Sequence, residues 1–451
     1  MITAMIIVFI VGYLAIALEH QININKTATA MMTGVLCWSI FILMSDDISL
    51  AANTHYQAFI KNNTALATPY IGFINFSLKE ALANTAEILF FLMAAMTIVE
   101  LIDAHEGFTV VTSRITTRNS RTLLWVISVI TFFLSALLDN LTTAIVMVSL
   151  VRKLVEEREK RLLYAAVVIV AANAGGAWSP IGDVTTTMLW MKGQISAINI
   201  IFGVLLPSIV SVLVPVIYFN FQIKGDLKPL KKSIVDDDKE HTSSKLASMT
   251  MLAVGIGALV FVPIFKNVTH LPPYMGMVIG LSVVWVISEL INSEKDAVLK
   301  HPLSAVHALS RIDTSSVLFF LGILIAIGAL ETTGILHHFA DAMSKALGNI
   351  DIVVIAVGIM SAIIDNVPLV AATQGMYSLT EYPIDSKLWH FLAYCAGTGG
   401  SILIIGSAAG IAVMGMEKIE FGWYMKKVSL IVLLGYLAGA GVYLLQYSAS
   451  H

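Results

Sequence analysis

Long apolar runs alternate with short polar segments along almost the whole chain. Because about 20 apolar residues span the hydrocarbon core of a bilayer as a helix, runs of this length predict membrane crossings. Ten such runs lie at about 2–18, 28–45, 82–102, 162–198, 199–221, 247–267, 272–291, 314–333, 388–421 and 427–447. Segment 46–81 is expected to be the longest loop on the outer side of the membrane. The pattern predicts an all-helical, polytopic membrane protein.

Two further apolar runs, at about 123–151 and 350–380, carry an Asp-Asn pair near their middle. Each run is too long for a single crossing, and Asp and Asn favour turns over helix interiors. We therefore expect two re-entrant hairpins with Asp-Asn at their tips, where protein or water satisfies the exposed backbone. Turn formation alone would explain these residue types, but not the free-energy cost of a carboxylate in an apolar run.

The two hairpins belong to a duplicated pattern. The tips read SALLDN at Ser135–Asn140 and SAIIDN at Ser361–Asn366. Each tip is followed, at a similar distance, by a Gly-rich interruption of a long apolar run, GGAWSPIGD at Gly175–Asp183 and GGSILIIGS at Gly399–Ser407. These interruptions predict broken helices over about 162–198 and 388–421.

Five crossings in each half would invert the second half relative to the first, as in many secondary transporters. The predicted organisation is a first inverted repeat at 1–222, a charged cytoplasmic linker at 223–246 and a second repeat at 247–451.

Charge supports a membrane protein and orients it. The chain is 57% hydrophobic and 13% charged, whereas soluble domains carry about 25% charged residues. If the segments alternate from a cytoplasmic loop at 103–122, 21 of the 27 Lys and Arg residues, including all seven arginines, fall on one side. By the positive-inside rule, both termini then lie outside, and the first hairpin enters from the cytoplasm and the second from outside.

The hairpin tips are the first candidates for chemistry. Asp139 with Asn140, and Asp365 with Asn366, place carboxylate and amide oxygens at membrane depth. Hard cations prefer such oxygen ligands, and a buried ionisable residue commonly marks an ion path.

The Gly-rich interruptions add further oxygen atoms. The first holds Asp183, Thr185 and Thr186 after Asn173, and unwound backbone there can also bind a cation. Hydrogen bonding between packed helices is the alternative role for the hydroxyl groups. The second interruption has Ser407 where the first has Asp183. We therefore expect the principal cation site at Asp139, Asn140 and Asp183, with Asp365 as a further partner.

Two other acids, Glu87 and Glu331, lie in apolar runs that share the motif LFFL. They are candidates for a proton relay, and acids at the membrane interface are the alternative. The sequence contains no nucleotide-binding Gly-rich loop, no metal-ligand pair on one helix face and no nucleophile constellation. We therefore expect a gradient-driven carrier rather than an enzyme, with no cofactor and no nucleic-acid partner.

Four strings, SALLDNLTTA, NAGGAWSPIGDVTTTMLW, SAIIDNVPLVAA and GTGGSILIIGSAAG, resemble the NhaD family of sodium/proton antiporters, within the ion transporter superfamily. The resemblance implies exchange of Na⁺ or Li⁺ for protons in a bacterial inner membrane, by a homodimer with scaffold helices and a mobile unit. Carried over by motif, the candidate site residues are Asp139, Asn140, Asn173, Asp183, Thr185, Thr186, Ser361, Asp365, Asn366, Thr398, Ser401 and Ser407.

The residues and the resemblance together predict an antiporter in which a cation and a proton compete for buried carboxylates during alternating access. Two alternatives stay open at this point. One is an anion or oxyanion carrier of the same superfamily, for a dicarboxylate or arsenite, and the other is a passive channel.

Overall fold

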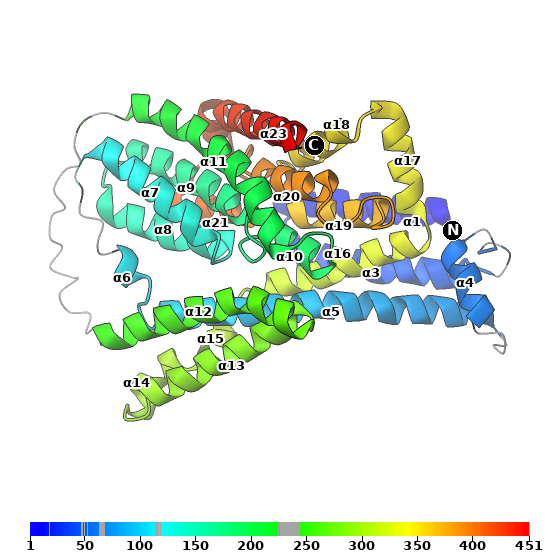
Figure 1. Cartoon of the computed structure of the whole chain (residues 1–451), viewed down its shortest axis with the longest axis horizontal. Coiled ribbons are helices and arrows are strands. Elements are labelled where there is room, and N and C mark those ends of the chain that lie inside the picture. Colours follow the sequence, from blue (N-terminus) through cyan, green and yellow to red (C-terminus); the bar gives the residue numbers. More distant parts are fainter. Residues whose placement is uncertain are drawn as a thin grey trace. The chain divides into compact units, whose positions relative to one another are not determined.

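The computed structural model describes residues 1–17, 19–46, 48, 50–51, 53–62, 68–112, 117, 119–223, 225 and 244–450. About 80% of the chain is helical, and helices account for all the regular elements in these residues (Figure 1). Most of the predicted linker at 223–246 lies outside the described residues.

Seven helices in the described part of the chain are long and apolar enough to cross a membrane. They are α3 (Lys26–Leu43), α5 (Pro69–Ala104), α11 (Ala197–Gln222), α12 (Lys245–Thr269), α13 (Pro273–Ile291), α16 (Thr314–Thr332) and a segment at Phe421–Ala449. Each coincides with a run predicted from the sequence, and the run at 2–18 forms the shorter apolar helix α1 (Ile2–Ala17). The chain is an integral, polytopic membrane protein.

The structure corrects the loop expected at 46–81. Residues in that range form α4 (Thr54–Asn62), and α5 begins at Pro69 rather than near residue 82. Proline suits the first turn of a helix because its missing N–H would have no partner there. Phe73 and Ile74 are buried. Apolar packing therefore stabilises the first turns of α5, in a segment whose polar residues had predicted a loop.

The remaining helices are shorter. They are α2 (Glu19–Ile22), α6 (Thr109–Thr112), α7 (Ser120–Ser135), α8 (Asn140–Leu154), α9 (Arg158–Ala177), α10 (Val184–Met191), α14 (Ala297–Lys300), η1 (His301–Leu303), α15 (Ala305–Arg311), α17 (Ile335–Leu347), α18 (Ile350–Met360), α19 (Asn366–Met376), α20 (Lys387–Gly399), α21 (Ala408–Glu417), α22 (Phe421–Tyr424), the π-helical turn η2 (Met425–Ser429) and α23 (Leu430–Ser450).

The contacts divide the chain into two compact units, each built from both halves of the sequence. Unit 1 comprises Met1–Phe90, Asp313–Val353 and Val367–Pro383, and unit 2 comprises Phe91–Ile312, Val354–Asn366 and Ile384–His451. In unit 1, α3 packs closely on α16. Gly322 allows this approach because it has no Cβ, which would lie 2.4 Å from the backbone N of Met31.

Unit 2 is built around α9 and α20. All residues of α20 from Leu388 to Gly399 are buried, as are those of α9 from Tyr164 to Ala177. A helix that is apolar all round belongs in an interior, and α7, α8, α11 and α21 pack against α9. These two central helices both end at the Gly-rich stretches, so the core of unit 2 leads directly to the candidate site.

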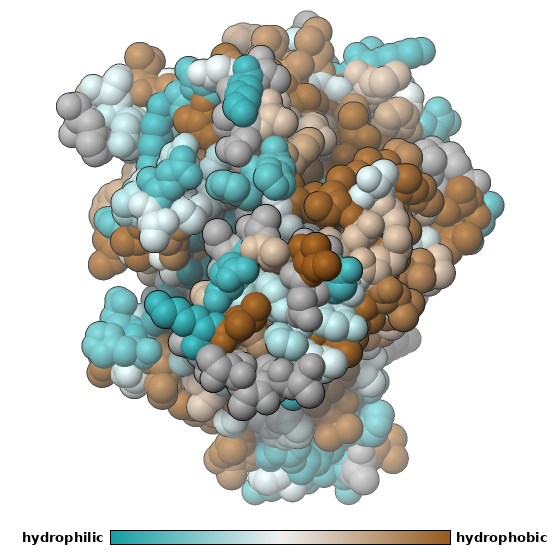
Figure 2. Space-filling model, turned by 90° about the vertical axis from the view of Figure 1, so that its right-hand side faces the viewer, coloured by the Kyte–Doolittle hydropathy of each residue, from teal (hydrophilic) through white to brown (hydrophobic). Residues whose placement is uncertain are grey.

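The surface agrees with a protein that lies in lipid. Large apolar side chains such as Phe202, Phe221 and Leu290 are more than half exposed. Figure 2 shows a broad hydrophobic area beside hydrophilic patches on one face of the molecule. Such contiguous apolar surface is unusual in a soluble monomer and normal on helices that face lipid.

Candidate cation site at two interrupted helices

Both Gly-rich stretches interrupt helices. Helix α9 ends at Ala177 and α10 begins at Val184, while α20 ends at Gly399 and α21 begins at Ala408. Each interruption frees backbone groups at one helix end and opens another helix start close by in the sequence.

Each interruption packs against a hairpin tip in the same way. A Cβ at Gly182 would lie 2.5 Å from the backbone O of Ser135, and a Cβ at Gly406 would lie 2.6 Å from the backbone O of Ser361. Only glycine allows these close approaches. The glycine at the equivalent position therefore allows the same close contact in both copies of the repeated pattern.

Matching serines reinforce this packing. The Ser135 hydroxyl donates to the backbone O of Ala172 at 2.6 Å, and the Ser361 hydroxyl donates to the backbone O of Ala396 at 3.0 Å. Each bond joins the first residue of a tip motif to the central helix beside it.

Asp183 lies at the centre of a hydrogen-bond network. Its side chain is buried, with 2% of the residue exposed. One carboxylate oxygen accepts from the Asn140 amide at 3.3 Å, and the other accepts from the Asn366 amide at 3.3 Å and the Thr185 hydroxyl at 2.5 Å. Asn140 and Asn366 are the first residues of α8 and α19, so one carboxylate joins both hairpin tips.

Asn173 links this carboxylate to the second interruption. Its side-chain oxygen accepts from the Asn140 amide at 3.0 Å, and its own amide donates to the hydroxyls of Ser401 at 2.8 Å and Ser407 at 2.9 Å. Ser407 also accepts from the backbone N–H of Gly410 as the N-cap of α21. The structure thus brings together candidate residues from both halves of the sequence.

The two tip carboxylates lie beside the network. Asp139 accepts from the backbone N–H of Thr142 at 2.8 Å and from its hydroxyl at 2.6 Å, as the N-cap of α8. Asp139 and Asp365 are both close enough to interact electrostatically with Asp183. The hydrogen bonds therefore centre on Asp183, and direct cation binding by either tip carboxylate stays a prediction.

Other candidates bond to nearby backbone instead. The Thr186 hydroxyl donates to the backbone O of Ala177 at 3.2 Å, and the Thr398 hydroxyl donates to that of Tyr394 at 2.6 Å. These bonds and that of Ser361 hold the interrupted helices in place. Glu87 and Glu331, the candidate relay acids, belong to unit 1 and take no part in the network, which lies in unit 2.

Comparison with known proteins places the chain in a family. Residues 6–389 match the family described as citrate transporter. The chain is 46% identical to sodium/proton antiporter 1 of Arabidopsis thaliana, over 98% of this chain and 72% of that protein. It is also 27% identical to the Na⁺/H⁺ antiporter NhaD of Alkalimonas amylolytica, over 97% of this chain and 89% of that protein.

The chain belongs to the citrate transporter family. Within this family it is of the NhaD type, as its four sequence strings predicted. Both relatives named here, one from a plant and one from a bacterium, carry the name of a sodium/proton antiporter.

Sequence reasoning missed two residues that hold the helices of this site. Ser135 occupies the same motif position as Ser361, so the repeat itself carried the signal. Glu417 is 4% exposed and pairs with Arg152 and Arg161. No sequence signal marked Glu417, because its partners lie more than 250 residues away in the chain.

The network consists of oxygen-bearing groups of mixed type: one carboxylate, amides and hydroxyls. Among the described residues, no Lys, Arg or His side chain takes part in its hydrogen bonds. Small hard cations favour oxygen ligands of this kind. The oxygen atoms of these groups can therefore serve as ligands for a cation beside the Asp183 carboxylate.

Proposed function

We propose that this chain exchanges Na⁺ or Li⁺ for protons, with Asp183 as the carboxylate that cation and proton share. The observation that carries the proposal is the burial of Asp183 at the meeting point of Asn140, Asn366 and Thr185. The names of the similar antiporters support it independently. The transported ions are the partners of the site, and no resident cofactor is proposed.

The proposed mechanism is competition. Removal from water disfavours an ionised carboxylate, so the empty, charged site is costly when the surrounding helices move. Either a proton or a cation neutralises Asp183, and both loaded forms can change sides. Because the empty form moves least readily, release of one ion must be followed by binding of the other, which gives obligatory exchange.

The helix starts around Asp183 set the charge balance. Asn140 and Asn366 begin α8 and α19, and Asp183 and Ser407 are the N-caps of α10 and α21. Helix N-termini carry partial positive charge, which stabilises a nearby carboxylate. A cation therefore binds only while Asp183 is ionised. When Asp183 is protonated, the partial positive charge of the helix N-termini repels the cation and favours its release.

The same helix starts favour a second candidate, transport of a carboxylate substrate, which is also what the family description names. Positive helix ends and amide donors suit an anion. Three carboxylates oppose this candidate, because Asp139 and Asp365 add to the charge of Asp183. The acids therefore make a bare cation the favoured cargo.

We further infer inverted repeats, with α7–α8 and α18–α19 as re-entrant hairpins in a homodimer whose termini lie outside. The equivalent contacts of Gly182 and Gly406 support the duplication, and the distribution of Lys and Arg supports the orientation. A bacterial inner membrane stays the proposed location.

The function is tested with the purified protein in sealed proteoliposomes that contain a pH-sensitive dye. Under an imposed pH gradient, addition of Na⁺ or Li⁺ should move protons at a rate that saturates with cation concentration. K⁺ and citrate serve as comparison substrates. Proton movement driven by citrate alone, or a Na⁺ flux whose rate is the same with and without the pH gradient, would contradict the proposal.

A further inference from the structure

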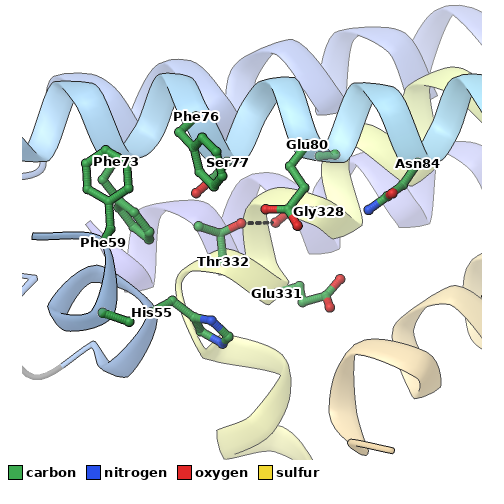
Figure 3. A pocket seen from close by; sticks show the side chains of 12 residues that line it. His55, Phe59, Phe73, Phe76, Ser77, Glu80, Asn84, Gly328, Glu331 and Thr332 are labelled. Atoms are coloured by element: carbon green, nitrogen blue, oxygen red, sulfur yellow. Dashed lines mark hydrogen bonds between the residues drawn. The ribbon is translucent and has the colours of Figure 1, made fainter. Parts of the chain in front are cut away.

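Unit 1 contains a cavity of about 460 Å³ that the proposed exchange does not use. It opens between α4, α5 and α16 (Figure 3). Its polar lining residues are His55, Ser77, Glu80, Asn84, Glu331 and Thr332, and no Lys or Arg is among the lining residues. The volume lies within the range of about 300–1,000 Å³ of small-molecule sites.

Two acids give this cavity a negative charge. Glu80 on α5 and Glu331 on α16 come from opposite walls, and Figure 3 shows Glu80 and Asn84 projecting from α5 toward α16. Within the described residues, neither carboxylate forms an ion pair with a basic side chain. Uncompensated carboxylates that face one space favour a positively charged occupant.

A serine hydroxyl on the same wall makes no hydrogen bond with the described residues. Ser77 lies on α5 one turn before Glu80, and only 7% of it is exposed. Among the described residues, its side chain has no hydrogen-bond partner. Because Ser77 lines the cavity, its hydroxyl is available to the polar head of a ligand there.

The other end of the cavity is aromatic. Phe59 lies 5.7 Å from Phe73 and 5.6 Å from Phe76 between ring centroids. All three rings line the cavity, and Phe76 is 55% exposed. Phenyl rings bury apolar surface and attract cations to their faces. A hydrated alkali ion gains little from such a wall, whereas an ion with an apolar body gains both interactions.

We propose that this cavity binds an organic ammonium ion, with the ammonium group at Glu80 and Glu331 and the apolar part on Phe59, Phe73 and Phe76. Ser77 accepts a hydrogen bond from the ammonium group. The site lies in unit 1, whereas the Asp183 network lies in unit 2. It is therefore a second cation site, distinct in chemistry from the proposed transport site and independent of whether the protein exchanges Na⁺.

The test is calorimetric titration of the full-length protein in detergent with benzylammonium, which joins one phenyl ring to one ammonium group. Benzyl alcohol is the uncharged comparison of nearly the same shape. Benzylammonium should bind saturably and benzyl alcohol should not. Glu80→Gln and Glu331→Gln should each weaken binding about threefold to fivefold, the upper part of the range for a solvent-accessible charge pair.

Glu156→Gln is the matched control, because Glu156 is an exposed acid of unit 2 and is not among the lining residues of the cavity. Phe59→Leu provides a second variant that keeps the charge and removes a ring, and it should also weaken binding. Equal binding of benzyl alcohol, an equal loss in Glu156→Gln, absence of benzylammonium binding, or displacement of benzylammonium by Na⁺ at equal concentration would each overturn the proposal.

Discussion

Replacement of Glu417 by Gln should loosen the helices that carry the candidate cation site. The Glu417 carboxylate accepts from Arg152 Nε at 2.6 Å and from Arg161 Nε at 2.7 Å. Glu417 ends α21, Arg152 lies in the last turn of α8, and Arg161 lies in the first turn of α9.

These three helices reach the Asp183 network with their other ends. Asn140 begins α8, Asn173 lies in the last turns of α9, and Ser407 caps the start of α21. One carboxylate therefore ties together the far ends of three elements whose near ends must keep their hydrogen-bond geometry. Without this tie, the donors around Asp183 lose part of their fixed positions.

The magnitude follows from burial. Loss of one partner of a fully buried ion pair costs about 3–5 kcal/mol, and an exposed pair is worth about 0.2–1 kcal/mol. The Glu417 side chain is 1% exposed, but those of Arg152 and Arg161 are 47% and 24% exposed. Water screens both arginines, so we expect Glu417→Gln to cost about 1–3 kcal/mol of unfolding free energy.

The assay is thermal unfolding in detergent, combined with the KM for Na⁺ in proteoliposomes. Glu420→Gln is the control, since Glu420 is exposed, lies three residues away and makes no side-chain cap bond. Glu417→Gln should lower the melting temperature and raise the KM, whereas Glu420→Gln should change neither. A melting temperature of Glu417→Gln equal to those of the wild type and of Glu420→Gln would refute this reasoning.

Two further predictions follow from packing and titration. Gly182→Ala should prevent folding or exchange, because the new Cβ would lie 2.5 Å from a backbone oxygen. Gly415→Ala should leave folding and exchange unchanged, because a Cβ there would meet open space. Expression, gel filtration and the exchange rate distinguish the two variants. Burial alone would raise the pKa of Asp385, but hydrogen bonds from Ser196 and Asn199 hold it below the ordinary value of an aspartate. Asp385→Asn should therefore cost about 1 kcal/mol at pH 7. Its melting temperature should approach that of the wild type only as the pH falls through the lowered native pKa of Asp385, where the native carboxylate also becomes protonated.

The helices and their interruptions followed from the sequence because the signals are local. Hydrophobic length predicts a crossing, and glycine pairs within apolar runs predict a break. The repeated Asp-Asn tips and Gly-rich stretches therefore identified Asp183, Asn140 and Asn366 as candidates that the structure brings together.

The rest depended on three-dimensional packing. Which of the three acids lies at the centre is decided by side-chain direction: Asp139 turns back to cap its own helix, while Asp183 faces the amides of Asn140 and Asn366. The early start of α5 required knowledge that Phe73 is buried. The cavity of unit 1 lies partly in the segment expected to be a loop, so its aromatic wall had no sequence signal.

Substitution of Asp183 tests the central claim most directly. Asp183→Asn keeps the size of the side chain and removes the charge that cation and proton are proposed to share. Na⁺-driven proton movement in proteoliposomes should fall to the level of empty liposomes in this variant, while Gly415→Ala retains the wild-type rate. Saturable Na⁺/H⁺ exchange by Asp183→Asn at the wild-type rate would contradict the account.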